Sequence, residues 1–420
     1  MKSPLNPSLS PVVIGRDSLR GEVFQSIAAF SRWLESYGYD SHDPYDIWGT
    51  RIGIMARRTY YRSSLVGLPL VGPILLMEIL CPRLRALFLK KCRYATADAQ
   101  LALAFLNLYE LTCERAYLEK AEGICRDLIS YSVPGYKGYC WGYPFDWQNV
   151  NNLTPRNTPF ITTTPYCFEA FLKLADLSGE TCWLDAAFSV AKFVRFNLKD
   201  TPVGNDATAG SYSPYDEGKV VNASAYRAMV LFEAAHRFDI PEYAETAWGN
   251  LRFILQSQRD DGAWLYAIDN PGETFIDHFH TCFVLKNLHK LNLRLQNSSV
   301  VEAIRRGFDY YRKHLFAADG LPASFALAKR TRLVRWELYD FAEAITLGSL
   351  LNAYIPGALD VAESLAKLLC QRFQSPEGHF ATRIYKGGFK HTFPYLRWPQ
   401  AQLFYAMTNF LSVVTAKSVG

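Results

Sequence analysis

The amino-acid sequence predicts an all-α fold, an (α/α)6 toroid of six inner and six outer helices with short β-hairpin turns at one mouth. Two observations predict it. From residue 94 onward, helical patterns rich in small and apolar residues alternate with amphipathic ones, at a period of roughly sixty residues. A turn with glycine and an aromatic residue precedes the next apolar pattern. Helices that are apolar on most faces belong inside a ring, and amphipathic helices belong outside it.

The inner helices are the six patterns that are apolar or small on most faces. Proline is compatible with the first turn of a helix, because the N–H group that it lacks would have no partner there. Pro165 and Pro399 therefore fit helix starts. The six inner helices are expected to begin near Thr96, Thr164, Lys219, Phe275, Trp336 and Pro399.

The outer helices are the amphipathic patterns over residues 116–131, 182–198, 241–258, 299–316 and 358–374. A closed ring of six needs one more, and residues 19–38 are the best candidate. We therefore divide the chain into residues 1–93, an N-terminal helix followed by a basic and apolar arm, and residues 94–420, the toroid domain.

Two of the turns share a spacing of glutamine, three residues, glycine, one residue and an aromatic, beginning at Gln258 and Gln374. This spacing resembles the glutamine-tryptophan repeat of terpenoid cyclases, which are themselves α/α barrels. The chain has no DxDD or DDxxD acid cluster for cyclase or prenyl chemistry. We therefore interpret the repeat as architectural.

The arm carries most of the chain's positive charge. Residues 51–93 hold nine Lys and Arg against Glu78 alone, a local charge of +8 in a protein whose net charge is +5. Within them, residues 63–77 are uncharged and apolar, but they are too short and too interrupted by proline and glycine for a spanning helix, which needs about 20 residues. Two interpretations stay open, an interfacial contact with an anionic membrane and an arm that packs over one face of the toroid.

The remaining composition favours the cytoplasm and excludes several site classes. Nine cysteines include no CxxC pair, and the N-terminus lacks the apolar segment of a secretory signal. The sequons at Asn152, Asn222 and Asn297 are then chance matches. No GxGxxG follows a strand, and no phosphate-binding GxxxxGK[ST] or serine nucleophile elbow occurs, so we expect no cofactor and no nucleic-acid partner.

With six helical hairpins, the chain resembles the (α/α)6 toroids of carbohydrate-active proteins over about residues 94–415. These are the C-terminal domains of glucuronyl C5-epimerases, polysaccharide lyases, unsaturated glucuronyl hydrolases and N-acylglucosamine 2-epimerases. Residues 212–238 are similar to the epimerase segment in which a tyrosine-rich turn leads into a helix that starts with asparagine, and residues 394–407 resemble helix starts in proteins of bacterial exopolysaccharide loci. The resemblance implies a saccharide ligand.

The first candidate site lies on the inner helix that begins near Lys219. Asn222 and Tyr226 are four residues apart and so share a face. Proton abstraction next to a carboxylate needs a base such as Tyr or His and a group that holds the carboxylate as negative charge develops. Tyr226 and Asn222 suit these roles, with Arg397 as a bidentate clamp. The alternative is that Asn222 and Tyr226 only satisfy buried hydrogen bonds between the rings.

The second candidate lies in residues 274–291. On a helix, His278 and His280 point roughly 200° apart, so they cannot bind one metal ion, and no HExxH or Cys/His cluster elsewhere completes a site. We expect no metal. Asp277 and His280 do share a face, and Asp277 suits a helix cap. His280 is then either a catalytic or sugar-binding residue or part of an ordinary helix start.

A glycoside hydrolase needs two carboxylates across the sugar, and Asp146 with Asp216 or Glu217 could supply them. The alternative is that adjacent acids in a turn are solvated. Aromatic side chains in or beside the mouth turns could line a saccharide groove, and the rest of them would pack turns against helix ends. They are Trp141, Tyr143, Trp147, Tyr212, Tyr215, Trp264, Tyr266, Trp336 and Trp398.

The sequence therefore favours a cytoplasmic epimerase or lyase that acts on an acidic, uronic-acid-type saccharide in bacterial surface-polysaccharide synthesis. A glycoside hydrolase and a non-catalytic glycan-binding or scaffold protein are the alternatives.

Overall fold

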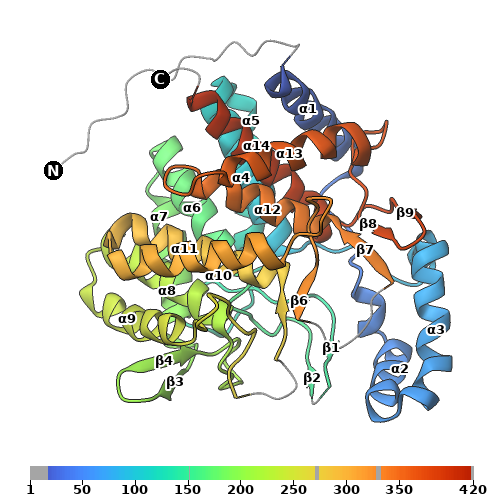
Figure 1. The fold of residues 1–420 in the computed structure, drawn as a ribbon, viewed down its shortest axis with the longest axis horizontal. Coiled ribbons are helices and arrows are strands. Elements are labelled where there is room, and N and C mark those ends of the chain that lie inside the picture. Colours follow the sequence, from blue (N-terminus) through green and yellow to red (C-terminus); the bar gives the residue numbers. More distant parts are fainter. Residues whose placement is uncertain (1–17, 151, 270–273, 328–332, 418–420) are drawn as a thin grey trace.

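A ring of six inner helices forms the centre of the molecule (Figure 1). The structure, a computed structural model, describes residues 18–150, 152–269, 274–327 and 333–417. Each inner helix begins within three residues of its expected start and packs against the next, and the last returns to the first. The inner helices are α4 (Ala95–Thr112), α6 (Pro165–Ser178), α8 (Val221–Arg237), α10 (His278–Leu295), α12 (Leu338–Leu351) and α14 (Ala401–Ala416).

Each inner helix has one amphipathic partner on the outside, so the chain is an (α/α)6 toroid, as the sequence predicts. Inner helices are buried on nearly every face, whereas outer helices bury one stripe. The outer helices are α5 (Arg115–Ser130), α7 (Cys182–Phe196), α9 (Pro241–Gln256), α11 (Ser298–His314), α13 (Ala358–Leu368) and α1 (Leu19–Tyr37).

The glutamine repeat explains how α1 becomes the sixth outer helix. The Gln258 amide donates to Ala303 O of α11 and to Gly262 O, both at 2.9 Å. The Gln374 amide makes the same two bonds, to Ser26 O of α1 at 2.9 Å and to Gly378 O at 2.8 Å. Each repeat thus ties its turn to the following outer helix, and α1 stands after α13 as α11 stands after α9. The ring therefore uses residues on both sides of residue 93, and a domain boundary there stays a prediction.

The glycine of the repeat lies where the outer helix passes closest, and Gly378→Ala is expected to lower the free energy of unfolding by about 2–4 kcal/mol. Gly378 has φ +111°, and a Cβ would lie 2.3 Å from Ala29 O of α1. Gly320 is a matched control with φ +75° and no atom near its missing Cβ, so Gly320→Ala should cost only about 1–2 kcal/mol. Urea unfolding of both variants measures the difference, and equal losses would contradict the close contact.

Short strands lie in the connections that lead from α5, α7, α9, α11 and α13 to the next inner helix, and they mark the mouth (Figure 1). β1 (Trp147–Gln148) pairs with β2 (Leu153–Thr154), β3 (Asp200–Val203) with β4 (Ala207–Gly210), and β5 (Ile276–Asp277) with β6 (Phe325–Leu327). β7 (Val334–Glu337), β8 (Arg383–Tyr385) and β9 (Lys390–His391) form one antiparallel sheet. All pairs are antiparallel.

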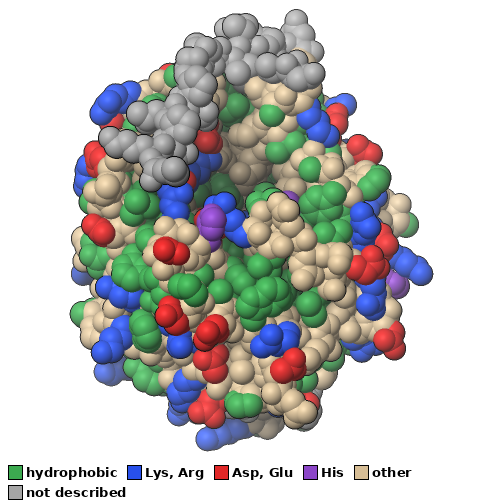
Figure 2. Space-filling view, turned by 90° about the vertical axis from the view of Figure 1, so that its left-hand side faces the viewer, with side chains coloured by type: hydrophobic (Ala, Val, Ile, Leu, Met, Phe, Trp, Pro, Cys, Tyr) green, Lys and Arg blue, Asp and Glu red, His purple; other side chains and the backbone are tan. Residues whose placement is uncertain are grey.

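Toward the opposite end of the ring, ion pairs join four of the inner helices, α4, α6, α8 and α10. Figure 2 looks onto this end, where acidic and basic side chains are interspersed. The pairs are Lys173–Glu110, Lys290–Glu169, Arg294–Glu233 and Arg237–Asp176.

The arm is a helical hairpin, with α2 (Arg51–Arg62) and α3 (Ser64–Leu80) between the short 3-10 helices η1 (Asp46–Gly49) and η2 (Pro82–Leu87). α3 runs through Pro69 and Pro73, so the apolar stretch is less interrupted than the sequence indicates. At 17 residues it is about 25 Å long. Within the described ranges, no helix combines the length and the hydropathy that crossing a bilayer requires.

Candidate functional site

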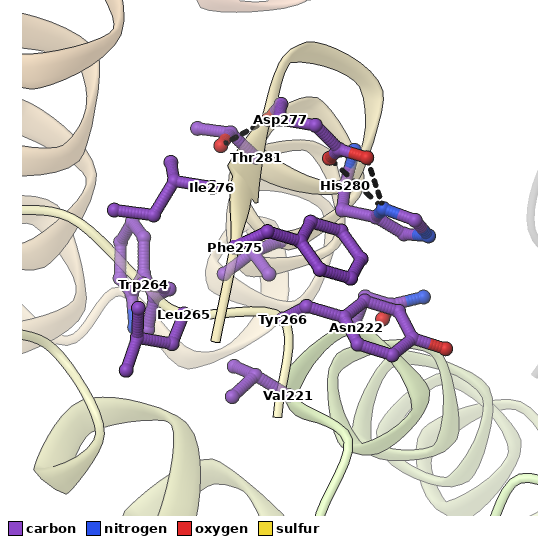
Figure 3. Close-up of a pocket in the computed structure, with 11 residues that line it drawn as sticks. Val221, Asn222, Trp264, Leu265, Tyr266, Phe275, Ile276, Asp277, His280 and Thr281 are labelled. Atoms are coloured by element: carbon purple, nitrogen blue, oxygen red, sulfur yellow. Dashed lines mark hydrogen bonds and ion pairs between the residues drawn. The ribbon is translucent and has the colours of Figure 1, made fainter. Parts of the chain in front are cut away.

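A small recess opens at the mouth where α8 and α10 begin (Figure 3). Its cavity volume is about 10 Å³, roughly the space that one water molecule needs. Apolar side chains from the turn before β5 form its wall, and its polar groups come from the first turns of the two inner helices. The lining residues are Val221, Asn222, Trp264, Leu265, Tyr266, Phe275, Ile276, Asp277, His280, Thr281 and Val284.

Asp277 and His280 form a dyad at the edge of the recess. Asp277 is the N-cap of α10, and its carboxylate accepts the His280 backbone N–H at 3.1 Å. The same carboxylate lies 2.9 and 2.8 Å from His280 Nδ1. A carboxylate accepts a proton donor, so Nδ1 carries the hydrogen and Nε2 keeps its lone pair. Nε2 has no partner among the described residues, and Figure 3 shows it on the side of the ring away from Asp277.

Asn222 lies opposite, in the first turn of α8, and is the clearest sign of a ligand. Its side chain is buried, yet neither amide atom has a hydrogen-bond partner in the described part of the chain. A buried amide left unsatisfied costs roughly 1–3 kcal/mol. Because Asn222 lines the recess, a hydroxyl or carboxylate group placed there would satisfy the amide.

Tyr266 and Phe275 make the aromatic side of the recess. Their rings are stacked with centroids 4.7 Å apart, and Tyr266 meets the His280 ring edge-on at 4.6 Å. Figure 3 shows the Tyr266 and His280 rings projecting in the same direction. This face suits the apolar side of a sugar ring.

His278 has a structural role, as its helical phase predicts. It is fully buried, with Nδ1 3.2 Å from Leu315 O and Nε2 2.8 Å from the Tyr311 hydroxyl. Burial lowers the pKa of His278 to about 4, so the ring is neutral near pH 7. The described residues hold no cluster of three potential metal ligands.

Asp277→Asn tests whether Asp277 only caps α10 or also orients the His280 ring. Asparagine caps a helix nearly as well as aspartate, so the free energy of unfolding should fall by at most about 1 kcal/mol. The neutral amide cannot stabilise a protonated His280, so turnover should fall at least about tenfold. Thermal melts and initial rates of the two proteins test this. Unchanged turnover or ligand binding in Asp277→Asn would show that the carboxylate only caps α10.

The structure does not bring Tyr226 and Arg397 to this recess. Tyr226 lies one turn further along α8, and its hydroxyl is 3.0 Å from that of Tyr166. Burial raises the pKa of Tyr226 well above its ordinary value, which opposes a role as base. Arg397 is already paired bidentately with Asp43, at 2.5 Å from Nε and 2.8 Å from Nη2. Its donor fork is therefore occupied by a carboxylate of the chain itself.

The three acids that a glycoside hydrolase would need, Asp146, Asp216 and Glu217, make contacts within and between loops. Asp216 accepts the backbone N–H groups of Tyr212, Ser213 and Gly218 and so holds its turn together. Asp146 accepts the Arg156 N–H at 2.7 Å, and Glu217 is exposed and pairs with Lys199 at 3.2 Å. None of the three lines the recess.

The aromatic residues of the turns divide into anchors and mouth residues. Trp141 and Trp264 are anchors, since they are buried and each donates its indole N–H at 2.9 Å to a carbonyl of the preceding outer helix, Leu128 and Ile254.

Three others contact side chains of neighbouring segments. Tyr212 hydrogen-bonds to Thr162, Tyr215 to Tyr136, and Trp336 packs edge-on against Phe373. Tyr143, Trp147, Tyr266 and Trp398 remain as candidates for a saccharide face at the mouth.

Two aromatic residues that the sequence analysis does not single out extend this face. Trp398 stacks on Tyr339 with centroids 3.8 Å apart, and Phe279 meets Trp398 edge-on at 5.4 Å. The Phe279 ring also lies 4.3 Å from His280, so aromatic rings run from the dyad to Trp398. In the sequence, Tyr339 and Phe279 are predicted to be core residues because they lie in apolar helices. Only their position in the first turn of an inner helix could have predicted that they lie near the mouth.

Comparisons with known proteins support the fold. No family model matches the chain, and no curated protein matches its sequence. Among solved structures, an unsaturated glucuronyl hydrolase specific for heparin aligns with a TM-score of 0.62 at 13% identity, over 97% of this chain and 99% of that one. The cellobiose 2-epimerase of Bacillus thermoamylovorans B4167 aligns with a TM-score of 0.61 at 12% identity, over 77% and 88%. A polysaccharide lyase aligns with a TM-score of 0.54 at 14% identity, over 77% and 91%. The chain therefore has the toroid fold of these proteins.

Proposed function

We propose that the protein is an enzyme that abstracts a proton from an acidic saccharide, as an epimerase or a lyase. One observation carries this proposal: the buried, unpaired Asn222 amide and the dyad-held His280 line the same recess. Together they supply a base and a hydrogen-bond donor for the charge that develops when a carbon next to a carboxylate loses its proton.

The chemistry follows from these positions. His280 Nε2 takes the proton from the ring carbon next to the carboxylate, and Asp277 stabilises the imidazolium that forms. The electron pair left on carbon moves into the carboxylate, whose oxygen accepts the Asn222 N–H. Delivery of a proton from water to the opposite face gives the epimer, and His280 then releases its proton to solvent. Loss of the substituent on the neighbouring carbon, with formation of a C=C bond, gives the lyase product.

The size of the recess limits what it can hold. At about 10 Å³ it has room for about one water-sized group, so it suits a single polar group of a sugar, such as its carboxylate, and the ring itself must lie outside it. The rest of a saccharide would extend over the aromatic rings that run from His280 through Phe279 to Trp398. A uronic-acid residue within a longer chain fits this arrangement.

The structural neighbours, an epimerase, a lyase and a glucuronyl hydrolase, support a saccharide substrate. We further propose that the substrate belongs to bacterial surface-polysaccharide synthesis and that the protein acts in the cytoplasm.

Incubation with acidic oligosaccharides in D₂O tests the proposal. A new absorbance at about 232 nm, typical of an unsaturated sugar product of proton abstraction, identifies a lyase. Deuterium at one ring carbon with a changed NMR coupling pattern and no cleavage identifies an epimerase. Asn222→Ala should abolish either product. New reducing ends without deuterium would instead identify a hydrolase, and binding without any product would identify a glycan-binding protein. Either result overturns the proposal.

A further inference from the structure

The hairpin of α2 and α3 exposes an unusual amount of apolar surface. Of the twenty large apolar side chains that are exposed in the described chain, twelve lie in residues 52–88. In α3 only Gly67, Val71 and Glu78 are buried. The most exposed of the twelve include Ile52, Leu65, Val66, Leu76, Leu87 and Phe88. Contiguous exposed apolar surface of this kind marks an interaction site.

The charged side chains around this surface are all of one sign. Glu78 is the single acid of residues 51–93, and it is buried in an ion pair with Arg85. The exposed charged residues of the segment are Arg51, Arg58, Arg62, Arg83, Lys90 and Lys91. The surface therefore combines apolar side chains with about six free positive charges.

We propose that the α2–α3 hairpin docks on an anionic lipid surface, with its apolar side chains in the headgroup boundary and its cations against lipid phosphates. A basic, apolar helical element lies in the interface in this way, and each Lys or Arg near such a surface adds to the attraction toward anionic lipid. α3 is too short to cross the bilayer, which agrees with an interfacial position. A second copy of the chain is a poorer occupant, because a two-fold interface would set these cations against each other.

The hairpin is held firmly to the toroid, so docking would also orient the mouth. Arg85 bonds to Asp46 Oδ1 at 2.7 Å and pairs with Glu78, and the Glu78 backbone carbonyl lies 3.0 Å from His391 Nε2 of β9. On the other side, α2 packs against β1. The adjoining turns carry further exposed apolar side chains, Val150 and Phe389.

Exposed apolar side chains therefore occur both on the hairpin and on two turns of the mouth next to it. If the proposed function holds, the substrate class follows: a saccharide carried on a membrane lipid would meet the recess without leaving the surface.

Vesicle flotation tests the docking without any need for turnover. The full-length protein should float with vesicles of phosphatidylcholine and phosphatidylglycerol, at least about tenfold more than with phosphatidylcholine alone, and high salt should release it. Leu65→Glu/Leu68→Glu should abolish flotation. Both side chains are exposed, so the melting temperature should not change. Leu293→Glu is the matched control, since Leu293 is exposed to 64% at the far end of α10, and it should float like the unchanged protein.

Two results would overturn the inference. One is equal recovery with neutral and anionic vesicles, or none with either. The other is a dimer in analytical ultracentrifugation that Leu65→Glu/Leu68→Glu dissolves, which would assign the surface to self-association. Hydrogen exchange on the vesicles then tests the orientation: protection is expected in α2, α3 and the β1–β2 turn, and protection of α7 and α9 instead would contradict it. A protein that docks but converts no saccharide would refute the proposed function alone.

Discussion

His280→Ala is expected to leave the fold intact and to lower turnover by about 10²–10⁴-fold, the usual contribution of a general base. The side chain is partly exposed, and its ring bonds only to Asp277 among the described residues. Its removal therefore opens no buried cavity, and the melting temperature should change little. Initial rates on an acidic saccharide and a thermal melt measure the two effects.

His278→Ala is the matched control two residues away. It removes a fully buried ring and its two hydrogen bonds, so the free energy of unfolding should fall by about 2–4 kcal/mol. Turnover of the fraction that remains folded should be unchanged. If His278→Ala lost turnover and His280→Ala kept it, the assignment of His280 as the base would be wrong.

The second large effect concerns stability at the centre of the ring. Lys286 of α10 and Glu343 of α12 form a buried ion pair, with the Tyr166 hydroxyl 3.5 Å from the ammonium group. Burial alone would lower the pKa of Lys286, but Glu343 raises it above the ordinary value, so the pair is charged. Lys286→Met leaves one uncompensated carboxylate and should cost about 3–5 kcal/mol.

The double variant Lys286→Met/Glu343→Leu should recover most of this loss, because an apolar pair of similar volume needs no desolvation. Urea unfolding of the single and double variants measures the coupling between the two positions. Additive losses would mean that the two groups do not act as a pair.

Local sequence patterns are sufficient to predict the helices of the ring and, of the candidate site, Asn222, Asp277 and His280. Inner and outer helices differ in how many faces are apolar, which a single helix shows by itself. The Asp277–His280 pair could be predicted for the same reason, because a helix cap and the residue three positions later share a face. Asn222 could be predicted because the pattern identifies the start of its helix.

Tyr226 and Arg397 show where such reasoning ends. The partner of Arg397 is Asp43, 354 residues earlier, and the partner of Tyr226 is Tyr166 on another inner helix. No local spacing encodes either contact, so the sequence could show only that the side chains suit chemistry. In the folded ring, both side chains form hydrogen bonds with other residues of the chain.

The closure of the ring by α1 and the arm has a consequence for how the protein is made. α1 packs on α14, and Asp43 and Glu78 bond to residues 391–397, so α1 has to wait until α14 has been synthesised. At ribosomal rates of about 5–20 residues per second, the delay between the synthesis of α1 and that of α14 lasts on the order of tens of seconds. During that time the nascent chain presents the inner faces of α1 and α4 without their partner. We therefore expect chains that end before α14 to aggregate and full-length synthesis to benefit from chaperones that bind apolar helices.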